Sequence, residues 1–269
     1  MKNNSKLFIK IQRLLREIGC PRYLHHFGPK KYELKHHITA LITMQSLKLS
    51  LRRAVKWLKL FVSKVPTYSA LCKSRKRIPA SLWNSILKIT AGLQNRRVAI
   101  DGTGFSRTNP SFHYIKRIDR KNPVKRYAKL SALFSLDSRK FIALRVRARP
   151  RHDVKDAGYL LKQDSSMQKL FGDSAYDAES IHEYCWKSNI QAIIKPKKNA
   201  RRGFYRRKQR KNYSDEEYHQ RSVIESGFGS LKRKYGGYVL GKNIESMRAE
   251  IYCKAISHNL GLSSLEIFN

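Results

Sequence analysis

The sequence is short of acidic residues, of cysteines and of long apolar runs, and each shortage excludes a class of protein. Its 19 Asp and Glu stand against 57 Lys and Arg, which gives a formal net charge of +38. Its four cysteines are scattered, without the close pairs of zinc sites or the density of a disulfide framework, so we expect reduced, buried thiols. No run of about 18 apolar residues occurs, so we expect no transmembrane helix and no membrane partner.

The positive charge indicates a polyanionic partner. A charge of +38 repels itself and destabilises a compact chain unless an anion compensates it. Nucleic acid is the obvious compensating partner, whereas an enzyme of small neutral metabolites has no use for such a field. The 41% hydrophobic and 10% aromatic content excludes a disordered basic tail. The charged N-terminal segment is typical of an amphipathic helix rather than a signal peptide, so we expect a folded, cytoplasmic, nucleoid-associated protein.

Residues 1–95 have the periodicity of helices and are predicted to form a DNA-binding domain. Pro66 and Thr67, just before a short basic segment, are typical of a turn followed by a helix cap. A helix, a turn and a short basic helix resemble a helix-turn-helix in outline. A plain helical bundle with solvated Lys and Arg is the alternative. The predicted helices are 7–18, 38–60, 69–77 and 81–93.

Residues 96–269 alternate between strand and helix patterns and are predicted to form a mixed α/β domain. Two alternating runs joined by Asp137-Ser-Arg have the pattern of an antiparallel hairpin, and the later strands are separated by helices, which favours parallel pairing. The basic segment 195–211 is predicted to be a loop. The predicted strands are 98–105, 127–136, 141–149, 169–172 and 191–194, and the predicted helices are 154–167, 177–188, 215–234 and 244–260.

The strand predicted over 141–149 carries two kinds of side chain in alternation. Because successive side chains of a strand point to opposite faces, its apolar residues lie on one face and its arginines on the other. The arginines are Arg145, Arg147 and Arg149.

Carboxylates at particular positions are candidate metal ligands. Asp101 ends the first strand of the α/β domain, Asp173 follows Gly172 at a strand-to-helix junction, and Glu225 lies in a late helix. Ligands of open α/β sheets bind at the carboxyl ends of strands, and Mg²⁺ prefers a few carboxylates with water and phosphate oxygens. The alternative for each aspartate is a cap on the next turn or helix.

The helix predicted over 215–234 carries a narrow polar face. Ser214 and Glu217 have the spacing of a capping box that fixes the start of the helix. Four polar residues then fall within an arc of roughly 60° beside an apolar stripe. They are Tyr218, Arg221, Glu225 and Lys232. An acid flanked by cations and a phenol suits a metal ligand next to phosphate contacts, although an ion pair between Arg221 and Glu225 on a solvated face is the alternative.

This spacing resembles the YREK signature of the DDE transposases of prokaryotic insertion sequences. Asp101-Gly-Thr, His152-Asp153 and Gly172-Asp173 are similar to the surroundings of the family's acidic residues. The resemblance covers roughly residues 96–260 and implies a ribonuclease-H-like mixed sheet flanked by helices. It implies that Asp101, Asp173 and Glu225 are the catalytic metal ligands, holding two Mg²⁺ ions that Mn²⁺ can replace. The residues implied to contact DNA are Tyr218, Arg221 and Lys232, and the basic segment adds Lys197, Lys198, Arg201 and Arg202.

The resemblance also implies an activity. Such an enzyme cleaves the ends of its element and joins the freed 3′-OH to target DNA by two-metal-ion phosphoryl transfer. Its partners are double-stranded DNA, at the terminal inverted repeats and at the target, and we expect a homodimer on DNA. About 50 residues separate Asp173 from Glu225, which leaves no room for the large β-rich insertion of relatives that excise through hairpins. The alternatives are a metal-dependent, structure-specific DNA endonuclease and a catalytically decayed nucleic-acid-binding protein.

Overall fold

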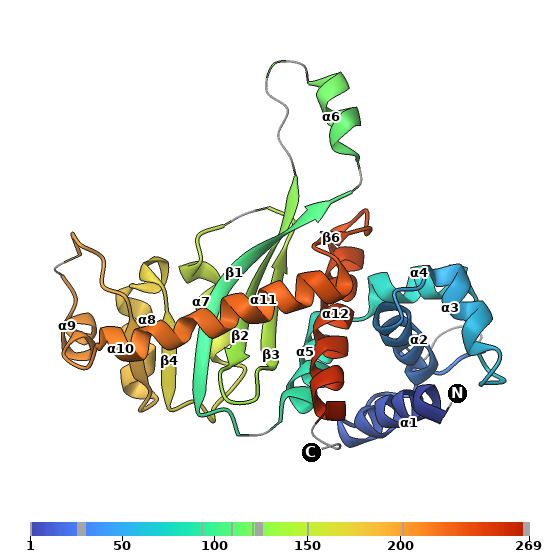
Figure 1. The fold of residues 1–269 in the computed structure, drawn as a ribbon, viewed down its shortest axis with the longest axis horizontal. Helices are drawn as coiled ribbons and strands as arrows, with labels where there is room; N and C mark the ends of the chain where they lie inside the picture. The colour runs from blue at the N-terminus through green and yellow to red at the C-terminus, as the bar shows by residue number, and fades with distance from the viewer. Residues whose placement is uncertain are drawn as a thin grey trace.

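The computed structural model describes residues 2–25, 31–92, 94–108, 110–119, 121, 126–149, 151–200 and 202–265. The N-terminal part is helical and the rest is built on a mixed sheet, with helices on both of its faces (Figure 1). The N-terminal helices are α1 (Lys2–Glu17), α2 (Leu34–Ser46), α3 (Leu51–Leu58), α4 (Tyr68–Arg77) and α5 (Ala80–Ala91).

The single helix predicted over 38–60 is wrong, because α2 ends at Ser46 and α3 begins at Leu51. Lys48 adopts a φ of 52°, which a continuing helix excludes. The Ser50 side chain then accepts a hydrogen bond from the Arg53 N–H and starts the second helix. The cap predicted before the basic helix is confirmed, since the Thr67 side chain accepts from the Ala70 N–H at 3.3 Å.

The sheet has the strand order β3-β2-β1-β4-β5. The first three strands pair antiparallel, whereas β4 and β5 run parallel to β1. The short strand β6 (Tyr238–Val239) pairs with the end of β1. The sheet strands are β1 (Arg97–Arg107), β2 (Tyr127–Ser135), β3 (Phe141–Arg147), β4 (Lys169–Gly172) and β5 (Gln191–Ile194). The predicted mixed sheet, with an antiparallel hairpin beside parallel strands and helices on its faces, is confirmed.

Two apolar clusters lie on opposite faces of the sheet. One joins the sheet to α7 (Val154–Leu161) and α8 (Glu179–Lys187), and the other joins it to α11 (Ser222–Tyr235), α12 (Ile244–Leu265) and the N-terminal helices. On α11 the predicted apolar stripe is confirmed, because Ile224, Phe228 and Leu231 are buried. Burial of this stripe sets the orientation of α11 on the sheet. The neighbouring polar face of the helix then lies beside the polar residues of β1.

The helix predicted over 215–234 is interrupted. The chain forms α10 (Asp215–Tyr218), a 3₁₀ turn η2 (His219–Arg221) and then α11. Ser222 contributes to this break, since its hydroxyl donates to the His219 carbonyl and competes with the helical pattern. The predicted cap is half correct: Ser214 accepts from the Glu217 N–H, but the Glu217 side chain pairs with Lys169.

Two helices were not predicted. The basic segment 195–211, expected to be a loop, contains α9 (Phe204–Arg210). Between β1 and β2 lies α6 (Phe112–Ile118), each of whose residues is at least partly exposed. Figure 1 shows that α6 stands away from the body on an arm that continues the two strands.

The N-terminal helices are packed directly against the last helix. One apolar cluster contains Ile38 of α2, Trp83 of α5 and Ile256 of α12. Polar contacts reinforce it, because the Ser46 and Ser257 hydroxyls lie 2.8 Å apart and the Tyr252 hydroxyl donates to Asn84 Oδ1 at 2.8 Å. The two ends of the sequence thus share one core. None of the helices that the structure describes is long and apolar enough to cross a membrane.

Candidate active site

Asp101 and Asp173 are placed by two neighbouring parallel strands. Ile100 of β1 pairs with Gly172 of β4, so the next residue on each strand is an aspartate. Because the strands are parallel and adjacent, both carboxylates emerge at the same level of the sheet. Burial of the preceding residues, Val98 to Ile100 and Leu170 to Gly172, fixes this register.

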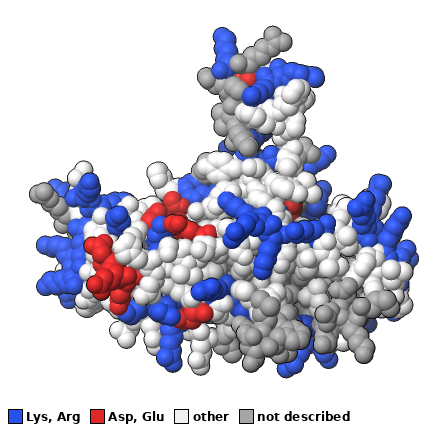
Figure 2. Space-filling model, in the orientation of Figure 1, with Lys and Arg blue, Asp and Glu red and all other residues white. Residues whose placement is uncertain are grey.

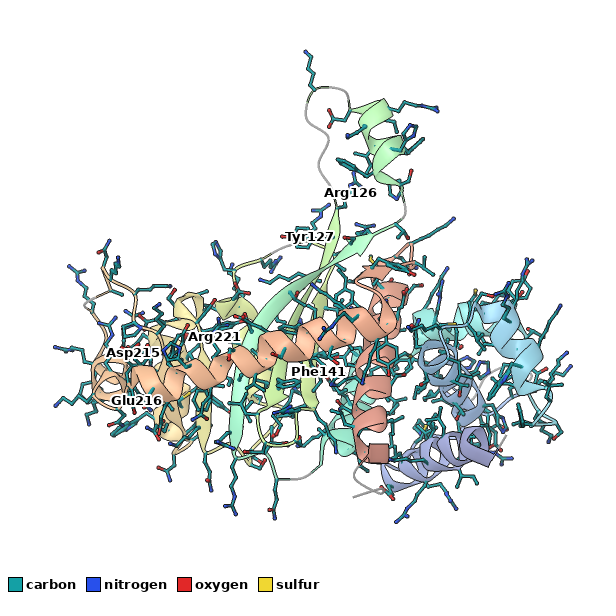
Figure 3. The ribbon with its side chains drawn as sticks, viewed as in Figure 1. Arg126, Tyr127, Phe141, Asp215, Glu216 and Arg221 are labelled. Atoms are coloured by element: carbon teal, nitrogen blue, oxygen red, sulfur yellow. The ribbon has the colours of Figure 1, made fainter. Side chains whose placement is uncertain are left out.

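Glu225 reaches Asp101 through Arg221. The Arg221 guanidinium donates to Asp101 Oδ2 at 2.8 Å and to Glu225 Oε1 at 2.5 Å. The ion pair within the helix, considered above as the alternative for Arg221 and Glu225, is therefore present. Its two ends differ in exposure: 57% of the Glu225 side chain is exposed, whereas only 17% of the Arg221 side chain is, because the same guanidinium also binds the acid of β1. Figure 3 shows Arg221 at the start of the long helix that crosses the sheet.

Asp101 lies within electrostatic range of the other two acids. Burial raises its pKa, the Gly102 N–H and Arg221 lower it, and the charges of Asp173 and Glu225 raise it further, with a net increase. Removing either neighbouring negative charge therefore favours ionisation of Asp101. The charges of Asp173 and Glu225 thus affect the ionisation of Asp101. A capping role for each aspartate alone does not require this.

Asp173 also performs the role considered as its alternative. Its Oδ1 accepts the Ala175 N–H at 2.9 Å and caps the short 3₁₀ turn η1 (Ser174–Tyr176). A cap of this kind orients the carboxylate and occupies one of its oxygens. Capping and ligand binding are therefore compatible in this residue.

A cavity of about 590 Å³ opens beside these aspartates. Its lining includes Asp101, Asp173, Asp153 and Lys129. Lys129 Nζ lies 2.7 Å from Asp153 Oδ1. A Cβ at Gly102 would lie 3.2 Å from Asp153 Oδ1, so a larger residue here would displace this carboxylate slightly. The remaining lining residues are Thr103, Gly104, Tyr127, Arg151 and His152.

The donor set fits a hard divalent cation. Across the described ranges, no three His, Cys, Asp or Glu side chains are gathered closely enough to hold a metal ion. The Arg221 guanidinium instead lies between Asp101 and Glu225 and neutralises them. The donors are nevertheless carboxylate oxygens, the type that Mg²⁺ and Mn²⁺ prefer. Withdrawal of one guanidinium would free an oxygen on each of two acids.

The other residues of the predicted polar face contact different parts of the body. Lys232 Nζ donates to Thr103 Oγ1 at 2.6 Å, and burial lowers the pKa of this lysine. The Tyr218 ring, on the separate helix α10, lies 5.8 Å from the Arg221 guanidinium carbon and 5.7 Å from Lys195 Nζ. Tyr218, Arg221 and Glu225 thus lie close together despite the break at η2, whereas Lys232 contacts β1 further along α11.

The predicted basic segment lies outside the cavity lining. Lys197, Lys198 and Arg202 are exposed, and Arg201 lies outside the described residues. The segment is fixed to the body by buried Asp177, which accepts the Lys197 N–H at 2.8 Å and contacts Arg206 at 3.0 Å. Figure 2 shows Lys and Arg spread over the visible face, arm included, while Asp and Glu form a few groups toward α10 and over the sheet.

A family model for the transposase DDE domain matches residues 92–260, more than half of the chain. The chain belongs to the transposase DDE family. The matched range begins just before β1 and ends within α12, so it contains Asp101, Asp173 and Glu225. This transposase domain also includes the arm and the arginines of β3.

The remaining comparisons add little to the family match. Among solved structures, a pre-cleavage Mos1 transpososome is similar over 90% of this transposase chain and 81% of that chain, with 9% sequence identity and a TM-score of 0.26. No curated protein matches the sequence.

Sequence reasoning gave no role to several residues of this transposase site. Lys129, Tyr127 and Arg151 line the cavity, but they come from a strand and a loop with no motif of their own. His152 and Asp153 were noted only as part of a resemblance. The sequence did hint at a role for Asp177 and Glu179, because acids are rare in this chain and both residues follow Asp173 closely.

Proposed function

We propose that the protein is a transposase of the YREK branch, encoded by a prokaryotic insertion sequence. It cleaves the ends of its element and joins the freed 3′-OH to target DNA. The observation that supports this most directly is the Arg221 guanidinium, which binds Asp101 and Glu225 together while Asp173 emerges beside Asp101. The closeness of residues so far apart in sequence supports a shared site in this proposal.

Asp101, Asp173 and Glu225 would hold the divalent cations, Mg²⁺ or Mn²⁺, in this proposal. When bound, a pair of such ions supplies charge neutralisation at phosphorus and lowers the pKa of a water or of a 3′-OH. The chain supplies three rigidly mounted acids, two on adjacent strands and one on a packed helix. Asp173 is oriented by its cap on η1, so its carboxylate needs little reorganisation.

The cations of the polar face would hold the DNA backbone. Arg221 is released from Asp101 and Glu225 when these acids bind metal, and its planar fork then suits a phosphate. Lys232 offers a point charge near Thr103, and Tyr218 stacks with cations beside the same cleft. Lys197, Lys198 and Arg202 are exposed on a segment that Asp177 holds in place, and they extend the contact surface.

The N-terminal helices would recognise the terminal inverted repeats. The short helix α4 follows a capped turn and exposes Lys73, Lys76 and Arg77. A basic helix after a turn is the part of a helix-turn-helix that enters the major groove. The proposal includes a homodimer that pairs two element ends, and a cytoplasmic, nucleoid-associated location where this DNA lies.

Two substitutions on one helix separate binding from chemistry. Glu225→Ala removes a negative charge from a DNA-facing cleft, so DNA affinity should stay the same or rise while cleavage and joining are lost. Arg221→Ala should weaken binding by about 1–3 kcal/mol through loss of a charge-assisted contact. Binding is measured by gel shift on inverted-repeat DNA, and chemistry by release and joining of a labelled 3′ end in Mg²⁺.

The outcomes distinguish the proposal from its alternatives. Cleavage by the wild type without any joining would indicate an endonuclease, and binding without cleavage would indicate a decayed enzyme. Cleavage at an undiminished rate in excess EDTA would contradict the metal chemistry. Loss of both binding and helical content in Glu225→Ala would make Glu225 a structural residue.

A further inference from the structure

A second cavity, of about 500 Å³, lies along the edge strand β3 and is lined by arginines from different elements. Arg145 and Arg147 belong to β3, Arg149 and Arg151 follow it, and Arg248 projects from α12. Tyr159 of α7 and Tyr252 of α12 complete its polar lining. Neither the acidic residues nor the basic segment discussed above belongs to this cavity.

The arginines of β3 are held in place by neighbours rather than extended freely. Arg147 Nε donates to Asp156 Oδ1 at 2.5 Å, and Asp156 is fully buried and also accepts from Ser131. The Arg145 guanidinium carbon lies 4.3 Å from the centre of the Tyr159 ring. Tyr159 is itself fixed, because its hydroxyl accepts from Asn84 Nδ2 at 2.7 Å. Such preorganised guanidinium groups lose little conformational entropy when they bind a ligand.

The charge of this cavity is largely uncompensated. Of its arginines, Arg147 is the one that forms an ion pair within the described ranges, and no described lining residue is acidic. Like charges held this close repel one another, so the cavity is a place where the fold loses stability unless an anion is bound. The planar guanidinium is the side chain best suited to a phosphate, which it binds through two parallel hydrogen bonds.

The arginine cavity adjoins the active-site cavity at Arg151. Arg151 lines both of them, and its backbone carbonyl accepts a hydrogen bond from Lys129, which lines the active-site cavity. A polymer that leaves the carboxylates along Lys129 and Arg151 therefore passes next to Arg149 and Arg147. A small anion would occupy only one of the two cavities.

We propose that the arginine cavity binds the backbone phosphates of the DNA strand that runs out of the active site. This inference rests on the proposed function and assigns the route of its substrate. Side chains two residues apart on one face of a strand are about 6.6 Å apart, so Arg145 and Arg147 present two guanidinium groups in a row along the groove. A backbone that follows this row can place its phosphates against both groups, and Arg248 approaches the same groove from α12.

The test uses the full chain with Arg145→Gln and Arg248→Gln combined, and measures equilibrium binding of a labelled duplex in EDTA, so that no chemistry contributes. Arg147 is left in place because Asp156 would otherwise be buried without its partner. Affinity should fall about tenfold, and the slope of log K against log salt should fall by about 1.8, or 0.9 for each lost phosphate contact. The matched control removes the same charge from exposed ion pairs, by Arg13→Gln and Lys187→Gln, and should change neither quantity.

A second variant keeps the test valid if the first is misfolded. Arg145→Lys with Arg248→Lys retains the charges and loses the planar forks, so the salt slope should stay at the wild-type value while affinity falls about threefold. An unchanged affinity and slope in both variants, with wild-type binding intact, would overturn the arginine site and leave the proposed function standing. Absence of DNA binding by the wild type would instead overturn the proposed function. Stabilisation of the protein by inorganic phosphate with unchanged DNA binding would assign the cavity to a small anion and also overturn the inference.

Discussion

Lys232 Nζ donates a hydrogen bond to Thr103 Oγ1 at 2.6 Å, which joins α11 to β1 two residues beyond Asp101. Arg221 makes the same connection at the start of the helix, through Asp101 itself. The helix that carries Glu225 is therefore fixed to the strand that carries Asp101 on both sides of the glutamate. The relative position of these two acids depends on this pair of contacts.

Replacing Thr103 tests the second contact. Thr103→Val removes the acceptor and leaves a partly buried ammonium group, so the free energy of unfolding should fall by about 0.5–1.5 kcal/mol. Thr103→Ser keeps the hydroxyl and should retain most of the stability. Urea denaturation monitored by circular dichroism measures both. Equal losses in the two variants would show that the methyl group, and not the hydrogen bond, matters at this position.

Two glycines of α11 are expected to respond in opposite directions to alanine. A Cβ at Gly227 would lie 2.6 Å from the Phe134 ring, so Gly227→Ala should cost about 1–3 kcal/mol through overpacking. A Cβ at Gly229 meets nothing within 4 Å, so Gly229→Ala should add up to about 1 kcal/mol through helix propensity. The same pair reports on function, because a displaced α11 carries Glu225 away from Asp101 and should slow cleavage in Gly227→Ala alone. Thermal melts and single-turnover cleavage assays measure the two effects.

Acid should destabilise the protein through Asp177 and His182, whose Oδ1 and Nε2 atoms lie 2.9 Å apart in the core. Burial raises the pKa of Asp177, but the Lys197 N–H, His182 and Arg206 outweigh it, so this pKa is lowered. Burial lowers the pKa of His182. In both cases the unfolded chain binds protons more readily than the folded one, so stability is highest above the unfolded pKa values and falls as the pH is lowered.

The two groups act in different pH ranges. The loss should begin near the ordinary histidine pKa of 6.5, and a further loss should follow below the ordinary aspartate pKa of 3.8. His182→Gln should flatten the first part of the dependence and Asp177→Asn the second. Urea unfolding across about pH 3 to 8, a range that spans both ordinary pKa values, measures both slopes. An unaltered slope near pH 6 in His182→Gln would contradict this assignment.

The basic segment should contribute salt-dependent DNA binding. Replacing Lys197, Lys198 and Arg202 by glutamine should reduce the slope of log K against log salt by up to about 2.7, or 0.9 for each contact. Their exposure means that the fold should be unaffected, which a thermal melt verifies. A wild-type slope in this triple variant would show that the segment does not touch DNA phosphates.

The acidic site was largely predictable because each part of it follows from local pattern. Apolar runs ending in Asp101 and Asp173 define strand ends, and helical periodicity places Arg221, Glu225 and Lys232 on one face. The second partner of Arg221 was not predictable, since Asp101 lies 120 positions away and no local signal records that contact. The break at η2 was not predicted for another reason. The Ser222 hydroxyl donates to the His219 carbonyl, and helical periodicity does not show that a side chain competes with the backbone for this acceptor.

Other elements were missed because tertiary contacts create them. α9 lies in a segment whose charge is typical of a loop, yet Glu179 accepts the N–H groups of Tyr205 and Arg206 and so caps the helix from a distant position. The arm helix α6 has Ser111 as its cap, since this side chain accepts the Tyr114 N–H at 3.2 Å, but none of its residues is buried against the body. The arginines of β3 were recognised as a face of the strand, while their cavity required α7 and α12 to be in place.

The packing of α12 against α2 and α5 has a consequence for synthesis of the chain on the ribosome. The helices made first bury their apolar residues against a helix made last, and Ser46 meets Ser257 across 211 positions. Until α12 leaves the exit tunnel, Ile38 and Trp83 lack part of their core and remain available to chaperones or to aggregation. A ribosome that stops before α12 therefore releases a chain whose N-terminal helices have no complete core. The N-terminal helices therefore complete their packing only after α12 has been translated.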